Sequence, residues 1–114
     1  MTEKPHILTV CGRNKRRSRT AEHIFKNNMR FSIRSVGLSP RSERQLQEKD
    51  LVWADRIYVM GQSQGTRIMQ TYRLLQLPPI ETLHIKDNYA YLQPELVHLL
   101  QDKLNLSLKA AFHI

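Results

Sequence analysis

Short apolar segments alternate with longer amphipathic segments along the chain, and this alternation is the feature that most restricts its fold. The apolar segments with the character of β-strands are residues 6–10, 31–36, 55–60 and 80–85. Apolar residues recur at three-to-four-residue spacing in the segments that follow them, from residue 18, within 42–54, over 62–77 and from 94. This order predicts a parallel sheet with helices on both faces, because each parallel connection must cross over the sheet. Ligands of such sheets bind beyond the carboxyl ends of the strands.

The helical spacing also predicts which side chains face the core. The predicted core positions are Ala21, Ile24, Phe25 and Met29 in the first helix, Leu46, Leu51 and Val52 in the second, and Leu96, Leu99, Leu100 and Leu104 in the last. Pro94 is expected in the first turn of the last helix, where its missing N–H costs nothing.

A chain of 114 residues predicts one domain spanning residues 1–114. Its one cysteine permits no internal disulfide, and its five scattered histidines include no pair at ligand spacing, so we expect no metal and no cofactor. No apolar run approaches the roughly 20 residues of a membrane span, and the first residues contain no signal-peptide apolar region. We therefore expect a cytoplasmic domain with no membrane partner.

Positive charge is concentrated in residues 13–44. This stretch holds ten Lys and Arg against two Glu, and therefore carries the whole net charge of +8. A polyanion such as nucleic acid, or a smaller phosphorylated substrate, would suit such a stretch. A merely solvated basic face is the alternative.

Cys11 follows the first predicted strand directly and precedes the first predicted helix. Five residues separate it from Arg17, and Ser18 comes next. A loop of this length can aim successive backbone N–H groups at one anion, at the positive end of the helix. Arg17 adds a bidentate fork for two phosphate oxygens, and the same positive field favours the thiolate form of Cys11. The segment therefore predicts phosphate-monoester chemistry at a thiolate, with Ser18 hydrogen-bonded to the sulfur.

The residues predicted to bind phosphate are those of this loop, namely Gly12, Arg13, Asn14, Lys15, Arg16, Arg17 and Ser18. Asn14 suits a left-handed backbone position within it. A lone cysteine at the end of a buried strand is otherwise most often a small core residue. The position between strand and helix, with Arg and Ser following, favours the catalytic interpretation.

The chain resembles the low-molecular-weight protein tyrosine phosphatases and their short predicted relatives. Cys11, Asn14 and Arg17-Ser18 match the family's loop, and residues 34–37 look like its Arg-Ser-Ala-Gly segment. Residues 50–60 are similar to its "D-x-x-x-A-D-x-I-x-V-M" stretch, and residues 85–89 resemble its Asp-Pro-Tyr loop. Cys11 precedes Asp87, which matches the aspartate of that loop. This order is that of the small class, whereas in the large tyrosine phosphatases the acidic residue precedes the cysteine.

The resemblance implies a three-layer α/β domain, flavodoxin-like, with a four-stranded parallel sheet in the order 2-1-3-4. It also implies a cysteine-dependent phosphomonoester hydrolase that acts on phosphotyrosine-type substrates through a cysteinyl-phosphate. Cys11 and Arg17 would be catalytic, and Asp87 would be the general acid. Tyr89 and Tyr91 would form an aromatic substrate wall. Phosphate, sulfate or vanadate would occupy the loop, which Ser35 would support by a hydrogen bond.

Three alternatives remain open at this point. Arg13 and Asn88 depart from the family's Gly and Pro, which motivates a catalytically weak phosphate- or phosphoprotein-binding module. An arsenate-reductase-like protein shares the fold, but a cysteine relay needs further thiols. Nucleic-acid binding would use the basic stretch, although much of that charge already belongs to the loop.

Overall fold

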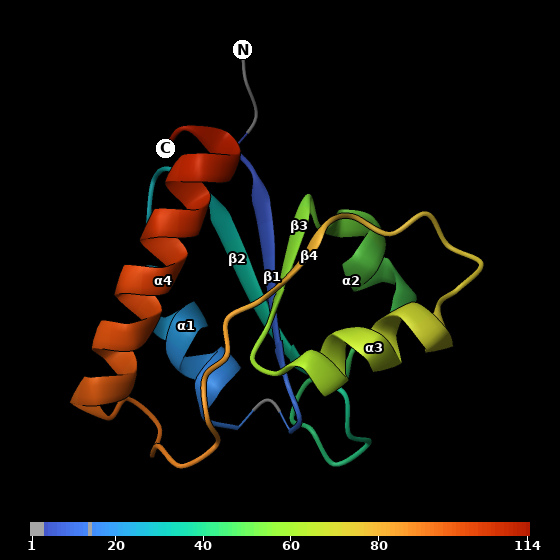
Figure 1. Cartoon of the computed structure of the whole chain (residues 1–114), viewed down its shortest axis with the longest axis horizontal. Coiled ribbons are helices and arrows are strands. Elements are labelled where there is room, and N and C mark those ends of the chain that lie inside the picture. Colours follow the sequence, from blue (N-terminus) through green and yellow to red (C-terminus); the bar gives the residue numbers. More distant parts are fainter. Residues whose placement is uncertain (1–3, 14) are drawn as a thin grey trace.

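The computed structural model of the chain describes residues 4–13 and 15–114, whose strands and helices alternate as the sequence predicts (Figure 1). In chain order the elements are β1 (His6–Cys11), α1 (Arg17–Phe25), β2 (Ser32–Gly37), α2 (Glu48–Trp53), β3 (Arg56–Val59), α3 (Gln62–Thr71), β4 (Ile80–Thr82) and α4 (Pro94–Phe112). None of these helices combines the length and the apolar character that a membrane crossing requires.

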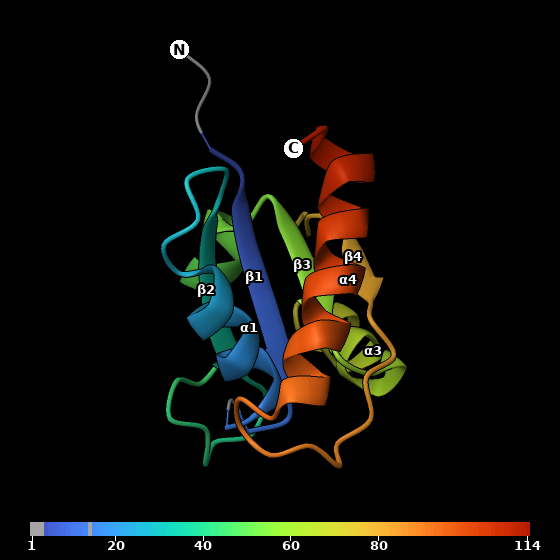
Figure 2. The same ribbon diagram turned by 90° about the vertical axis from the view of Figure 1, so that its left-hand side faces the viewer.

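The strands form one parallel sheet in the order β2-β1-β3-β4, which confirms the predicted order (Figure 2). Cys11, at the end of β1, is in register with Gly37 at the end of β2. The chain leaves β1 toward β2 on one side and returns to β3 on the other. The strand order therefore reverses at β1, and the carboxyl end of β1 is where such a sheet opens a crevice.

Helices cover both faces of the sheet, with α1 and α4 on one side and α2 and α3 on the other (Figure 1). Helix α4 packs an apolar stripe on the sheet, because four of its leucines recur at every fourth position and are fully buried. They are Leu96, Leu100, Leu104 and Leu108. Burying a leucine of this kind stabilises the fold by roughly 2 kcal/mol, so α4 contributes substantially to the stability of this face of the sheet.

Two predicted core positions are wrong. Met29 is 83% exposed because α1 ends at Phe25, so the helical spacing no longer applies. Val52 is 76% exposed because it follows the buried Leu51 on the short helix α2, and one helical step of about 100° turns it outward. The third helix is also shorter than predicted, ending at Thr71 rather than at residue 77.

The last strand is shorter than predicted as well, because its backbone turns at His84. This residue has a φ of 57°, in the left-handed region that a strand cannot contain. Beyond Thr82 the chain still follows β3, since the N–H of Leu83 bonds to Val59 and that of Ile85 to the carbonyl of Met60. This path carries the chain from the sheet edge to the carboxyl end of β1.

Candidate active site

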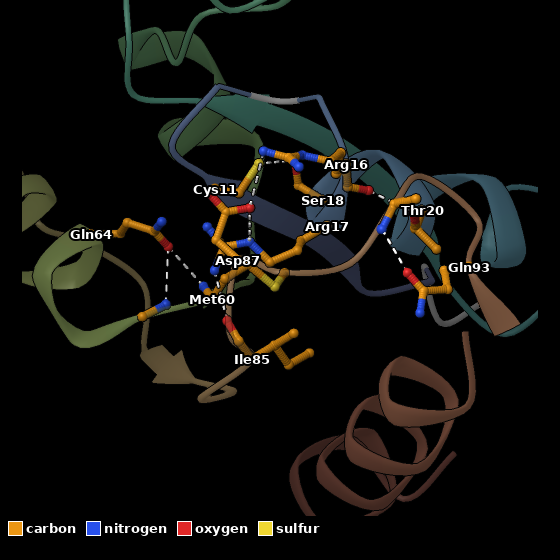
Figure 3. Close-up of polar contacts among 12 residues, drawn as sticks. Cys11, Arg16, Arg17, Ser18, Thr20, Met60, Gln64, Ile85, Asp87 and Gln93 are labelled. Atoms are coloured by element: carbon orange, nitrogen blue, oxygen red, sulfur yellow. Dashed lines mark hydrogen bonds and ion pairs between the residues drawn. The ribbon is translucent and has the colours of Figure 1, made fainter. Parts of the chain in front are cut away.

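Cys11, at the carboxyl end of β1, is only 3% exposed. Its Sγ lies 2.9 Å from the Oγ of Ser18, in the first turn of α1 (Figure 3). Ser18 is fully buried, and its Oγ is also 3.4 Å from the carbonyl oxygen of Val36. The strand end and the helix start therefore place a hydroxyl directly beside the sulfur, as the sequence predicts.

The guanidinium of Arg17 is held from two sides. Its Nη1 donates a hydrogen bond of 2.7 Å to the carbonyl oxygen of Ile85, and its Nε lies 3.6 Å from Oδ1 of Asp87. Arg17 is 8% exposed, so little rotamer freedom remains. The anchor is itself fixed, because the N–H of Ile85 donates to the carbonyl of Met60 at the end of β3. The arginine is thus set in place relative to the sheet.

These side chains border one cavity of about 330 Å³ at the carboxyl end of the sheet. A cavity of this size accommodates a phosphoryl group and part of its leaving group. It is lined by Cys11, Gly12, Arg13, Lys15, Arg16, Arg17 and Asp87. Four of these seven residues are cationic and one is acidic, so the cavity attracts anions.

The positive end of α1 faces the same cavity. The helix begins at Arg17 and has no acidic residue in its first turn to neutralise its dipole. Most of the predicted phosphate-binding residues line the cavity, whereas Ser18 lies behind it against the sulfur. Asn14 lies outside the described residues. Binding of an anion by the backbone of residues 12–17 stays a prediction.

Asp87 reaches the cavity from the segment between β4 and α4, which passes across the carboxyl ends of the strands (Figure 1). Its Oδ1 lies 3.6 Å from both Nη2 of Arg16 and Nε of Arg17. The side chain is 56% exposed, so protons can exchange with solvent. A carboxyl group at this position can serve a substrate whose phosphorus faces Cys11.

Thr20 holds the acid-bearing segment in place, and no sequence pattern points to it. Its hydroxyl donates 2.6 Å to the carbonyl of Arg16 and accepts the N–H of Leu92 at 3.0 Å. The first bond is a common one, from a threonine hydroxyl to the backbone carbonyl four residues earlier in a helix. The second crosses from α1 to the segment before α4 and has no local signature. The side chain of Gln93 stabilises the turn before α4 by accepting a hydrogen bond of 2.8 Å from the N–H of Ala90.

Three predicted supporting residues lie elsewhere. Ser35 bonds to Glu22 of α1 through its N–H and its hydroxyl, rather than to the phosphate loop. Tyr89 packs against the core beneath α4, and Tyr91 contacts His23 and lies below the guanidinium of Arg19. Neither tyrosine is among the described residues that line the cavity. The predicted aromatic wall is therefore not assembled beside Cys11, because the segment turns both rings toward α1 and the core.

The described part of the chain contains no cluster of side chains that could bind a metal ion. Among residues 4–13 and 15–114, no three His, Cys, Asp or Glu side chains are grouped closely enough to hold an ion. The groups that converge on the cavity are a thiol, guanidinium groups, an ammonium and one carboxyl.

Comparison of the sequence with family models and with curated proteins finds no match. Solved structures with the same fold do exist. SP-PTP, a low-molecular-weight protein tyrosine phosphatase from Streptococcus pyogenes, is 15% identical, with a TM-score of 0.73 over 95% of this chain and 93% of that one. The tyrosine phosphatase Wzb from Escherichia coli K30, in complex with phosphate, is 16% identical, with a TM-score of 0.71 over 96% and 99%. The YwlE arginine phosphatase from Geobacillus stearothermophilus is 19% identical, with a TM-score of 0.69 over 93% and 94%.

Proposed function

We propose that this chain, which has the fold of the low-molecular-weight protein tyrosine phosphatases, is a cysteine-dependent phosphomonoester hydrolase for phosphotyrosine-type substrates. One observation carries the proposal: the thiol of Cys11, the guanidinium of Arg17 and the carboxyl of Asp87 border a single cationic cavity. The reaction requires a nucleophile, a group that binds the phosphate oxygens and a proton donor, and these three side chains can supply them in that order.

In the first step the thiolate of Cys11 attacks phosphorus, and the bond between phosphorus and the leaving oxygen breaks. Arg17 binds two equatorial oxygens, whose charge persists through the transition state. Asp87 gives its proton to the departing oxygen, so the alcohol or phenol leaves neutral. The products are a cysteinyl-phosphate and an Asp87 carboxylate.

In the second step water attacks the phosphorus of the cysteinyl-phosphate. The carboxylate of Asp87 takes one proton of the water, and the phosphorus–sulfur bond breaks to release inorganic phosphate and the thiolate. The hydroxyl of Ser18, 2.9 Å from Sγ, supports this step by donating a hydrogen bond to the sulfur as charge returns to it. Apart from the attacking water and the substrate, every group in both steps comes from this chain.

The same cavity should bind inorganic phosphate, sulfate and vanadate, since each presents several anionic oxygens to Arg17. We also propose that the protein works in the cytoplasm, because reducing an oxidised Cys11 in a chain with one cysteine takes an external thiol, which a reducing compartment supplies.

Hydrolysis of 4-nitrophenyl phosphate tests the function. Wild type should turn over and be inhibited by vanadate, whereas Cys11→Ser should lose turnover and still be stabilised thermally by phosphate. Ser63→Ala, on the exposed surface of α3, is the matched control and should behave as wild type. Vanadate binding by wild type without any turnover would replace the hydrolase with a phosphate-binding module. Turnover by purified Cys11→Ser would overturn the role of the thiol.

A further inference from the structure

A second, smaller cavity lies directly beside the one that Cys11 borders. Its volume is about 190 Å³, and it is lined by Arg13, Lys15, Arg41 and Glu43. Arg13 and Lys15 also line the first cavity. The two cavities therefore share a wall made of cationic side chains, and a substrate in the first can extend over that wall into the second.

The second cavity is built by the segment that follows β2. The N–H of Leu38 donates to the carbonyl of Cys11 at 3.1 Å, and that of Ser39 donates to the carbonyl of Gly12 at 2.8 Å. The hydroxyl of Ser42 lies 3.4 Å from the same Gly12 oxygen. Arg41 stands between these attachments, so its position is coupled to the phosphate loop.

The three cations of this cavity have no acidic partner. Within residues 4–13 and 15–114, the side chains of Arg13, Lys15 and Arg41 form no ion pair or hydrogen bond, and all three are exposed. Nearby cations are paired differently: Arg16 and Arg17 contact Asp87, and Arg44 contacts Glu22.

Glu43 does not neutralise the three cations, because its carboxylate is engaged elsewhere. Its Oε2 accepts a hydrogen bond of 2.8 Å from Nη1 of Arg19. Three like charges around a space of this size repel one another, and a bound anion would relieve that repulsion.

We propose that this second cavity is an anion subsite, so that preferred substrates carry a second anionic group beside the phosphate that is cleaved. The proposal rests on the proposed function for the first cavity. The anionic group is a carboxylate or a second phosphate on a residue that flanks the phosphotyrosine. Both groups would be bound by the same guanidinium and ammonium donors.

The test uses one phosphotyrosine peptide with flanking Gln, Glu, Lys or phosphoserine. Wild-type kcat/KM should rise in the order Lys, Gln, Glu, phosphoserine, by roughly two- to fivefold per step for partly exposed pairs. Arg41→Gln should reduce the ratio of the Glu peptide to the Gln peptide. Arg67→Gln, which removes an exposed arginine from α3, should leave that ratio unchanged. The Glu and phosphoserine peptides separate a carboxylate ligand from a phosphate ligand.

Binding to Cys11→Ser, followed by fluorescence anisotropy, separates this proposal from the proposed function. The same order of affinities should appear without turnover and should shrink in Cys11→Ser/Arg41→Gln. Affinities independent of flanking charge, or an equal charge preference with and without Arg41, would overturn the subsite. If no peptide is hydrolysed but the order of affinities holds, the proposed hydrolase fails and the subsite stands.

Discussion

Oδ1 of Asp87 lies 3.6 Å from Nε of Arg17, so the candidate general acid contacts the candidate phosphate-binding arginine directly. Arg17 comes from the start of α1, whereas Asp87 comes from the segment after β4. A phosphate bound at Arg17 would compete with this carboxylate for the guanidinium. The contact would therefore couple anion binding to the position of the candidate acid.

Asp87→Asn should slow hydrolysis most for substrates with poor leaving groups. An activated phenolate leaves unaided, whereas a tyrosine-like phenolate with a pKa of about 10 needs the proton, and general acids of this kind contribute roughly a hundredfold or more. The measurement is kcat/KM across aryl phosphates of graded leaving-group pKa. Asp102→Asn, exposed on α4, is the matched control. A uniform loss along the series would mean that Asp87 is not the acid.

The same variant should bind inorganic phosphate more tightly. Removing the charge of Asp87 takes away the competitor for Arg17, so the inhibition constant for phosphate should fall. Phosphate inhibition of 4-nitrophenyl phosphate hydrolysis measures this. Weaker inhibition in Asp87→Asn than in wild type would show that the carboxyl does not compete with the anion.

Ser18→Ala should slow the second chemical step more than the first. Its Oγ is 2.9 Å from Sγ of Cys11, and a hydrogen bond to a charged group is worth about 1.5–3 kcal/mol, or roughly ten- to a hundredfold in rate. If release of the thiolate is slowed, a burst of phenol equal to the enzyme concentration should precede a slow steady state. Quenched-flow kinetics would detect it, and steady-state loss without a burst would place the role of Ser18 earlier.

The sequence predicts the parts of this site that are local in the chain. Cys11, Arg17 and Ser18 lie at one strand-to-helix junction, where spacing alone brings them together. The alternation of strands and helices follows from the same kind of short-range pattern, since each apolar run must be buried against its neighbours. The strand order 2-1-3-4, in contrast, is implied by the family resemblance. The prediction of Asp87 rests on a resemblance of short segments rather than on periodicity.

Long-range contacts leave no such pattern. The bond from Arg17 to the carbonyl of Ile85 joins residues 68 apart, and a backbone carbonyl has no signature in the sequence. Tyr91 shows how such contacts can defeat a sequence prediction. Its ring contacts His23 and Arg19 of α1 and is therefore turned away from the predicted aromatic substrate wall. Val52 shows that a short helix contains too few turns for its buried face to be assigned by spacing.

Alkylation of Cys11 should depend on the charge of the reagent. Cys11 is 3% exposed and borders a cavity lined by cations. After each rate is divided by that of a free thiol with the same reagent, the anionic iodoacetate should therefore react roughly tenfold faster than the neutral iodoacetamide. All labelling reports on this residue, because the chain has one cysteine. Phosphate should protect, and added salt should reduce the ratio. Equal normalised rates for the two reagents would contradict a cationic entrance.

The hydroxyl of Tyr58 closes a polar network beneath α4, away from the cavity. It lies 2.7 Å from Oγ of Ser107, which donates to Glu81 at 2.8 Å, so the tyrosine is the donor of the first bond. Arg56 donates to the Tyr58 oxygen and to Glu81. Burial raises the pKa of Tyr58, so the folded state keeps a neutral phenol there.

Tyr58→Phe should lower the free energy of unfolding by about 2 kcal/mol near neutral pH, because it removes two hydrogen bonds, the one donated to Ser107 and the one accepted from Arg56. Above about pH 10 the unfolded tyrosine loses its proton while the folded one retains it, so wild-type stability falls as the pH rises. Phenylalanine has no such proton, and the difference between the two proteins should therefore shrink. Urea unfolding from pH 7 to 11 measures both effects. Tyr72→Phe is the matched control, because the Tyr72 hydroxyl bonds to no described residue. A constant difference across this range would mean that Tyr58 titrates alike in both states.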